Sequence, residues 1–286
     1  MAAERLAPYA RLPRPYRQQT VLHSTVDAFG RAHWLLRAPT APRDLYDAVV
    51  VTVEDGRPYE THLGSVQARF PKLDALPDGG FVVADSRTRA GTDQVQVFDA
   101  LGRPSWGFTV GDGIEHLLGD ESGNLWVGYF DEGVFGDPLS APCVRCWSQT
   151  GAPVWEYRPQ PGERHPVDCY ALNVDRRAAW AYPYTEFPLI EAREGRPARV
   201  RGTPVRGAKG LAVHGDRVLF FGGYRNGRDR VHDCRLTETS VESVAERRLA
   251  RPDGGTLGSC RVVCRGPRLY VQEKPCTEWN VLDIAG

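Results

Sequence analysis

The chain has 286 residues, of which 41% are hydrophobic, and its 36 Lys and Arg balance 36 Asp and Glu at a formal net charge of +0. A chain of this length and composition can bury a full core, which excludes a disordered protein. Nucleic-acid and anionic-membrane binders need a surplus of cations, so we expect neither as a partner.

The ends and the cysteines indicate the compartment. No apolar run approaches the roughly 20 residues that span a bilayer, and residues 1–10 lack the apolar segment of a secretion signal. The seven cysteines are an odd number without the spacing of a small disulfide scaffold. We therefore expect a cytoplasmic protein whose cysteines are mostly buried thiols.

A repeat sets the predicted architecture. Polar turns followed by β-prone apolar runs occur at Gly30, Gly80, Gly123, Arg177, Gly215 and Gly266. Their mean spacing is about 47 residues, close to that of four-stranded propeller blades. A second series of turns, from Gly56-Arg57-Pro58 to Gly195-Arg196-Pro197, runs out of phase with the first. The sequence predicts an all-β, six-bladed β-propeller in one domain.

In chain order, the predicted elements begin with a strand within residues 5–12. The blades then cover approximately residues 19–66, 67–111, 112–160, 165–205, 206–250 and 257–286. The third blade is the clearest, with strands at residues 115–118, 125–129, 144–147 and 154–157. No stretch keeps a 3.6-residue period, so we expect no helix. Residues 281–286 resemble residues 97–102, so the last blade stops one strand short, and we expect residues 5–12 to supply that strand.

This pattern resembles the six-bladed propellers of the broad group that contains NHL-repeat proteins and SMP-30/gluconolactonase-type enzymes. Residues 123–133 and 168–173 are also similar to an uncharacterised bacterial propeller family. Lactonases of the group bind calcium through Glu, Asn and Asp side chains around the axis. The resemblance therefore implies a divalent cation as a candidate cofactor, with no metal ligand assigned to a particular residue.

The loops fall into two classes. Those on one face are short turns, whereas those on the other are longer and carry charged and aromatic residues. Binding residues concentrate on such loops of a rigid scaffold, so we expect a site at the mouth of the central channel on this second face.

The longest of these loops, residues 129–138, combines carboxylates, aromatics and glycines. In one interpretation Asp131 and Glu132 act in acid–base chemistry or bind a hard metal, while Tyr129 and Phe135 line an apolar pocket. In the other, the carboxylates accept backbone N–H bonds and the aromatics pack beneath the turn.

Residues 161–170 lead into the fourth inner strand. Strand alternation places Asp168, Tyr170 and Leu172 on one face unless a bulge intervenes. Asp168 would then join charged residues near the starts of other inner strands, in a ring that suits a polar or anionic molecule. The alternative is that these charges pair with one another. The other members of the ring are Lys72, His116, Lys209 and Arg261.

Equivalent loops of adjacent blades each offer a tyrosine with a charged neighbour, namely Tyr184 with Glu186 and Tyr224 with Arg225. Tyrosine with arginine is a common pair for recognising carboxylates or planar ligands. The alternative is a tyrosine packed over its loop and a solvated arginine.

Two functions follow from these residues. The first is a small-molecule site, with Asp131, Glu132, Asp168, Glu186 and His116 as candidate catalytic groups of a hydrolase or lyase that acts on an ester, lactone or C–O bond. The candidate substrate-binding residues are Tyr129, Phe135, Tyr170, Tyr184, Tyr224, Arg225, Lys72, Lys209 and Arg261. The second function is a non-catalytic propeller that binds a ligand or a protein partner.

Overall fold

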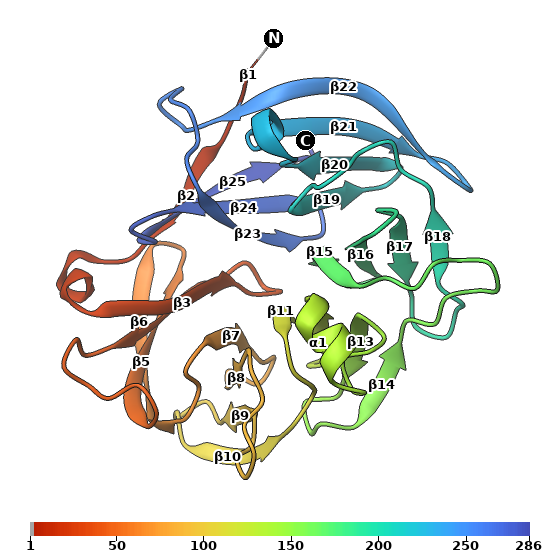
Figure 1. Cartoon of the computed structure of the whole chain (residues 1–286). Coiled ribbons are helices and arrows are strands. Elements are labelled where there is room, and N and C mark those ends of the chain that lie inside the picture. The colour runs from red at the N-terminus through yellow and green to blue at the C-terminus, as the bar shows by residue number, and fades with distance from the viewer. Residues whose placement is uncertain (1–2) are drawn as a thin grey trace. The chain divides into compact units, whose positions relative to one another are not determined.

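The computed structural model describes residues 3–286, which form an all-β protein (Figure 1). The chain divides into two compact units. Unit 1 comprises residues 1–9 and 161–286, and unit 2 comprises residues 10–160. No helix of the described residues is long and apolar enough to cross a membrane.

Unit 2 contains three antiparallel sheets, and in each of them four consecutive strands lie in chain order. The first comprises β3 (Thr20–Val26), β4 (Ala32–Arg37), β5 (Tyr46–Glu54) and β6 (Arg57–Val66). The second comprises β7 (Pro71–Ala75), β8 (Phe81–Asp85), β9 (Val95–Phe98) and β10 (Pro104–Phe108). The third comprises β11 (Ile114–Gly119), β12 (Leu125–Tyr129), β13 (Val144–Trp147) and β14 (Pro153–Glu156).

Unit 1 repeats this meander. Its strands are β15 (Asp168–Val174), β16 (Ala179–Tyr184), β17 (Leu189–Ala192) and β18 (Arg199–Arg201), then β19 (Gly210–His214), β20 (Arg217–Phe221), β21 (Arg230–Leu236) and β22 (Val241–Ala250). The last three are β23 (Cys260–Arg265), β24 (Arg268–Glu273) and β25 (Glu278–Asp283). A parallel bridge between Asn173 and Cys264 joins β15 to β23.

The N-terminal segment adds strands to two of these sheets. Strand β1 (Ala3–Arg5) runs parallel to β22, and β2 (Ala7–Arg11) lies next to β25. Leu6, between them, is 3% exposed and packs in one core cluster with Leu249 and Leu282. The strand that the last meander lacks is thus supplied from residues 7–11, within the segment that the sequence indicated.

An aspartate at the start of a turn explains why these short segments reverse direction. In three turns its carboxylate accepts the backbone N–H groups two and four residues on, and a Gly with positive φ lies between those two residues. The three aspartates are Asp27, Asp99 and Asp120.

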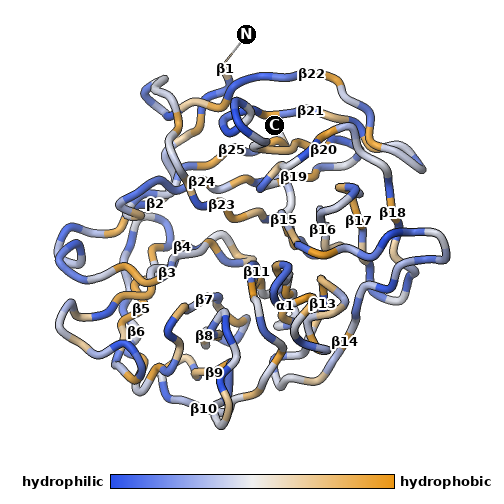
Figure 2. Tube along the Cα trace, viewed as in Figure 1, coloured by the Kyte–Doolittle hydropathy of each residue, from blue (hydrophilic) through white to orange (hydrophobic). Residues whose placement is uncertain are grey.

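Strand β20 is largely hydrophobic, whereas β22 of the same sheet is largely hydrophilic (Figure 2). In unit 2, Leu35, Val50 and Leu63 of the first sheet pack against Leu73 and Phe98 of the second. These two sheets thus bury a face against each other.

The expectation that the chain has no helix is wrong at one place. Residues Asp131–Gly136 form a short helix, α1, and two 3-10 helices occur at Arg14–Gln18 (η1) and Arg225–Gly227 (η2). Two acidic residues in the first turn of α1 suit its N-terminus. Gly133 lets α1 lie close to the backbone of Asp112, because a Cβ at position 133 would lie 2.2 Å from the carbonyl oxygen of Asp112.

Candidate functional site

The predicted site residues divide between the two units. Unit 2 holds Lys72, His116, Tyr129, Asp131, Glu132 and Phe135. Unit 1 holds Asp168, Tyr170, Tyr184, Glu186, Lys209, Tyr224, Arg225 and Arg261.

Unit 1 brings three of the predicted tyrosines together. Tyr170, Tyr184 and Tyr224 surround Phe187, and the centroids of neighbouring rings lie between 5.1 and 6.4 Å apart. We call these four residues the aromatic patch. Phe187 is only 3% exposed, whereas Tyr184 and Tyr224 are 39% and 51% exposed. The patch therefore has a buried base and solvent-facing phenol groups.

A β-bulge places Tyr170 in the patch. The pairing of β15 with β16 shifts between Cys169 and Ala171, so Tyr170 is the extra residue. Tyr170 packs against the core cluster that contains its neighbour Ala171, and Leu172 is not part of that cluster. The prediction that Tyr170 and Leu172 share a face is therefore wrong. The bulge interrupts the alternation of side chains, so Tyr170 packs on the same side as Ala171.

The position of Tyr224 depends on a glycine in the connection between β18 and β19. The backbone of Gly207 has φ +71°, and a Cβ at this position would lie 2.6 Å from the Tyr224 ring. The ring can lie there only because residue 207 has no side chain. The Tyr224 hydroxyl in turn donates a hydrogen bond of 3.1 Å to the hydroxyl of Tyr170.

Two residues of the site were not predicted. Phe187 adopts φ +55°, and its carbonyl oxygen accepts a hydrogen bond of 2.9 Å from the Thr203 hydroxyl. The Arg206 guanidinium lies 5.9 Å from the Phe187 ring centroid and donates to the backbone oxygens of Thr203 and Val205. Neither residue could be singled out from the sequence, because only the fold shows which side chains meet.

Burial of Tyr170 raises the pKa of its phenol, and the neighbouring Tyr224 hydroxyl and the charge of Asp168 raise it further. Asp168 lies directly opposite Tyr184 in the β15–β16 pairing. A phenol with a raised pKa keeps its proton at neutral pH and can donate it in a hydrogen bond. The site thus combines aromatic faces, a proton donor and a carboxylate.

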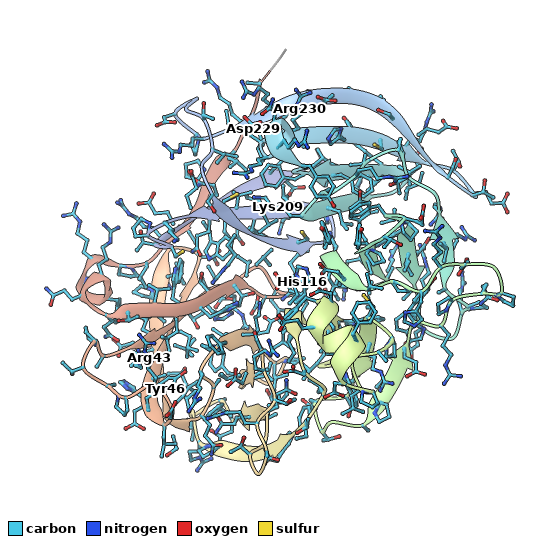
Figure 3. All side chains as sticks on the ribbon, in the orientation of Figure 1. Arg43, Tyr46, His116, Lys209, Asp229 and Arg230 are labelled. Atoms are coloured by element: carbon cyan, nitrogen blue, oxygen red, sulfur yellow. The ribbon has the colours of Figure 1, made fainter. Side chains whose placement is uncertain are left out.

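The other predicted residues of unit 1 have different surroundings. Lys209 directly precedes β19 (Figure 3), and its ammonium lies 3.3 Å from the Cys260 sulfur and 5.2 Å from the Phe221 ring centroid. Glu186 is exposed and forms an ion pair of 3.1 Å with Arg164. Arg225, at the start of η2, is exposed. Arg261, on β23, is partly buried.

In unit 2, Tyr129 does not line a pocket. Its side chain is fully buried, and its hydroxyl donates a hydrogen bond of 2.6 Å to the Val110 carbonyl oxygen and accepts one of 3.2 Å from the Trp147 indole. Burial raises the pKa of Tyr129. The expectation of a substrate-facing Tyr129 is therefore wrong, because the residue belongs to the core beneath α1.

The carboxylates of α1 serve contacts within the unit. Arg87 pairs with Glu132 at 2.5 Å and with Asp112 at 3.0 Å, and its guanidinium lies over the Phe130 ring. Asp131 accepts a hydrogen bond of 2.8 Å from the Glu132 backbone. Phe135, in contrast, is 76% exposed and does not lie beneath the turn.

The two remaining predicted residues of unit 2 lie on inner strands. Lys72 donates a hydrogen bond of 2.6 Å to the Glu115 carbonyl oxygen, so it links β7 to β11. His116 follows a bulge in β11 and is partly buried (Figure 3). Among residues 3–286, no group of three or more His, Cys, Asp and Glu side chains is placed to hold a metal ion.

Comparison with solved structures identifies the fold. Over 96% of its length the chain is similar to virginiamycin B lyase from Staphylococcus aureus, covering 98% of that chain at 9% identity and a TM-score of 0.53. It is also similar to a streptogramin B lyase, at 11% identity, 97% coverage of both chains and a TM-score of 0.52. No protein-family model and no curated protein matches the chain. The similar structures are β-propellers, and at this identity the likeness supports a propeller fold alone.

Proposed function

We propose that the aromatic patch of unit 1 binds a small polar molecule with a ring-shaped body. The observation that carries this proposal is the exposure of Tyr184 and Tyr224 above the buried Phe187. A sugar-like ring can lie against exposed aromatic faces, and phenol hydroxyls can bond its oxygens. Arg206, beside Phe187, offers a cation to an anionic substituent.

Hydrolysis or elimination at this site would use Asp168 and Tyr170. The Asp168 carboxylate would take a proton, from the attacking water in hydrolysis or from the substrate carbon in elimination. The protonated Tyr170 hydroxyl would donate a hydrogen bond to the carbonyl or leaving oxygen of the ester or lactone, whose C–O bond breaks. The support is that Asp168 acts electrostatically on Tyr170 and that the pKa of Tyr170 is raised. Glu186 is paired with Arg164, and Glu132 is paired with Arg87. Either glutamate could act as a base only after its ion pair is broken.

The test is a calorimetric titration of the full chain with three probes: glucono-1,5-lactone, glucuronate and 4-nitrophenyl acetate. Replacing Tyr184 or Tyr224 by alanine is expected to weaken binding about three- to tenfold, the range of one aromatic contact. The matched control is Tyr59→Ala, because Tyr59 is a 53% exposed tyrosine of unit 2. If Tyr59→Ala weakens binding as much as the other two, or if none of the probes binds, the proposal fails.

Release of 4-nitrophenol tests the catalytic part separately. Asp168→Asn is expected to abolish release above the uncatalysed rate while probe binding remains. If Asp168→Asn released 4-nitrophenol at the unchanged rate, Asp168 would not be the base, and only the binding part of the proposal would stand.

A second candidate function is supported by the loops of unit 2. Phe70 and Phe135 are 62% and 76% exposed, and exposed aromatics are typical of protein interaction surfaces. In this alternative the chain is a non-catalytic platform for a protein partner. Replacing both residues by serine would then abolish partner binding and leave the aromatic patch intact.

We also propose that the sheets are six blades of one ring of the NHL/SMP-30-like group and that the chain acts in the cytoplasm. The support is the spacing of about 47 residues between repeats, the addition of β2 to the last meander, and seven cysteines without a disulfide. A crystal structure with five or seven radial sheets would contradict the blade number.

A further inference from the structure

A cavity lies in unit 2, and no predicted site residue lines it. It has a volume of about 670 Å³, within the range of small-molecule sites. Strands β4, β5 and β6 form its floor, and the segment containing η1 forms a wall. These strands lie at the left of Figure 1, in the red-to-orange part of the chain.

The register of the three strands explains the floor. Leu36 pairs with Val49, and Val49 pairs with His62, so the three side chains lie in a row on one face of the sheet. Gly64, which also lines the cavity, leaves space beside this row. A Cβ on Gly64 would meet only the Asp47 carboxylate, at 3.9 Å.

The wall is fixed by a chain of polar contacts. The Tyr16 hydroxyl of η1 donates a short hydrogen bond to Glu60 of β6, and this bond raises the pKa of Tyr16. The other Glu60 oxygen lies 3.3 Å from the His62 imidazole. The cavity is therefore a built feature of the unit, with η1 tied to the strand that it faces.

The polar groups around the apolar floor are available to a ligand. Within residues 3–286, the side-chain amides of Gln18 and Gln19 make no hydrogen bond. Asp47 accepts the Ser65 backbone N–H with one carboxylate oxygen, at 3.0 Å, which leaves the other oxygen for a further donor. In the part of the chain that the structure describes, no Lys or Arg lines the cavity, and Asp47 is its one acidic lining residue.

We propose that this cavity binds a small organic ammonium ion, with the ammonium on Asp47 and the apolar body on Val49 and Pro39, two lining residues whose side chains are accessible. The carboxylate selects for the positive charge, and the amides of Gln18 and Gln19 accept or donate the remaining hydrogen bonds. The site is independent of the aromatic patch, so either proposal can fail alone.

The experiment compares three ligands of similar shape by calorimetric titration of the full chain. They are 2-phenylethylammonium, the neutral 2-phenylethanol and the anionic 3-phenylpropanoate. We expect the ammonium to bind about three- to fivefold more tightly than the alcohol, the range of one solvent-exposed ion pair. The carboxylate should bind most weakly. Equal affinity for the ammonium and the alcohol, or no binding, would overturn the proposal.

Two variants test the location. Asp47→Asn keeps an oxygen for the Ser65 N–H and should remove the preference for the ammonium over the alcohol. The matched control is Asp55→Asn, which alters an exposed carboxylate in the turn between β5 and β6, outside the cavity, and should change nothing. Gly64→Leu should block all three ligands, because the added side chain fills the cavity. Full binding by Gly64→Leu, or a preference that survives Asp47→Asn, would place the site elsewhere.

Discussion

Replacing Gly207 by alanine tests whether the aromatic patch is preformed. An alanine at φ +71° costs about 1–2 kcal/mol of stability, because its Cβ crowds the following carbonyl oxygen in the left-handed region. The same Cβ would lie 2.6 Å from the Tyr224 ring, which must move. Loss of the ring contacts adds about 0.5–1.5 kcal/mol, so we expect a total of about 1.5–3.5 kcal/mol.

Two glycines of the same unit separate the two contributions. Gly215 has φ +60°, and a Cβ added there would have nothing within 4 Å, so Gly215→Ala should show the backbone cost alone. Gly227 lacks a positive φ and is equally open, so Gly227→Ala should be nearly neutral. Urea unfolding measures the free energies, and titration with glucuronate measures binding. If Gly207→Ala behaves like Gly215→Ala in both assays, the Tyr224 ring does not rest on Gly207 and the reasoning is refuted.

Four further predictions concern other parts of the chain. Leu6→Ala should cost about 2–4 kcal/mol in urea unfolding, because Leu6 is buried between β1 and β2; a change below about 0.5 kcal/mol would contradict the N-terminal pairing. Tyr129→Phe should cost about 1–3 kcal/mol, because it leaves the Val110 carbonyl oxygen and the Trp147 N–H unpaired, whereas an equal loss for Tyr224→Phe would contradict the difference in burial. Burial alone would raise the pKa of Asp27, but the hydrogen bond to His33 and the charge of Arg31 lower it to about 2. The resulting stability is present above the unfolded pKa of about 3.9 and is lost as the pH falls towards 2, so acid titration of Asp27→Asn should show a smaller loss. In a thiol-reagent assay of the native protein, Cys260 and Cys276 should react first and the five buried cysteines only on unfolding; seven thiols reacting at one rate would contradict this burial pattern.

Local sequence predicts the strands because turn chemistry recurs along the chain. Asp27, Asp99 and Asp120 each start a turn whose hydrogen bonds lie within five residues, so such turns can be recognised without the fold. The loops of Tyr184 and Tyr224 can be recognised in another way, from their equivalent positions in successive repeats.

The remaining features depend on contacts distant in sequence. Glu132 is 45 residues from Arg87, and the Tyr129 hydroxyl bonds a carbonyl 19 residues away. The bulge at Tyr170 and the positive φ of Phe187 reflect tertiary packing that overrides strand alternation. The cavity of unit 2 likewise depends on the docking of η1 against β6, for which the sequence has no local signal.

The central claim is that the aromatic patch contacts a ligand directly. Its most direct test is NMR of the full chain with ring-labelled tyrosine, titrated with glucuronate. We expect the ring signals of Tyr170, Tyr184 and Tyr224 to shift together with one dissociation constant, while the signal of Tyr59 stays in place. Shifts confined to Tyr59, or no shift in any of the three patch tyrosines, would contradict the claim.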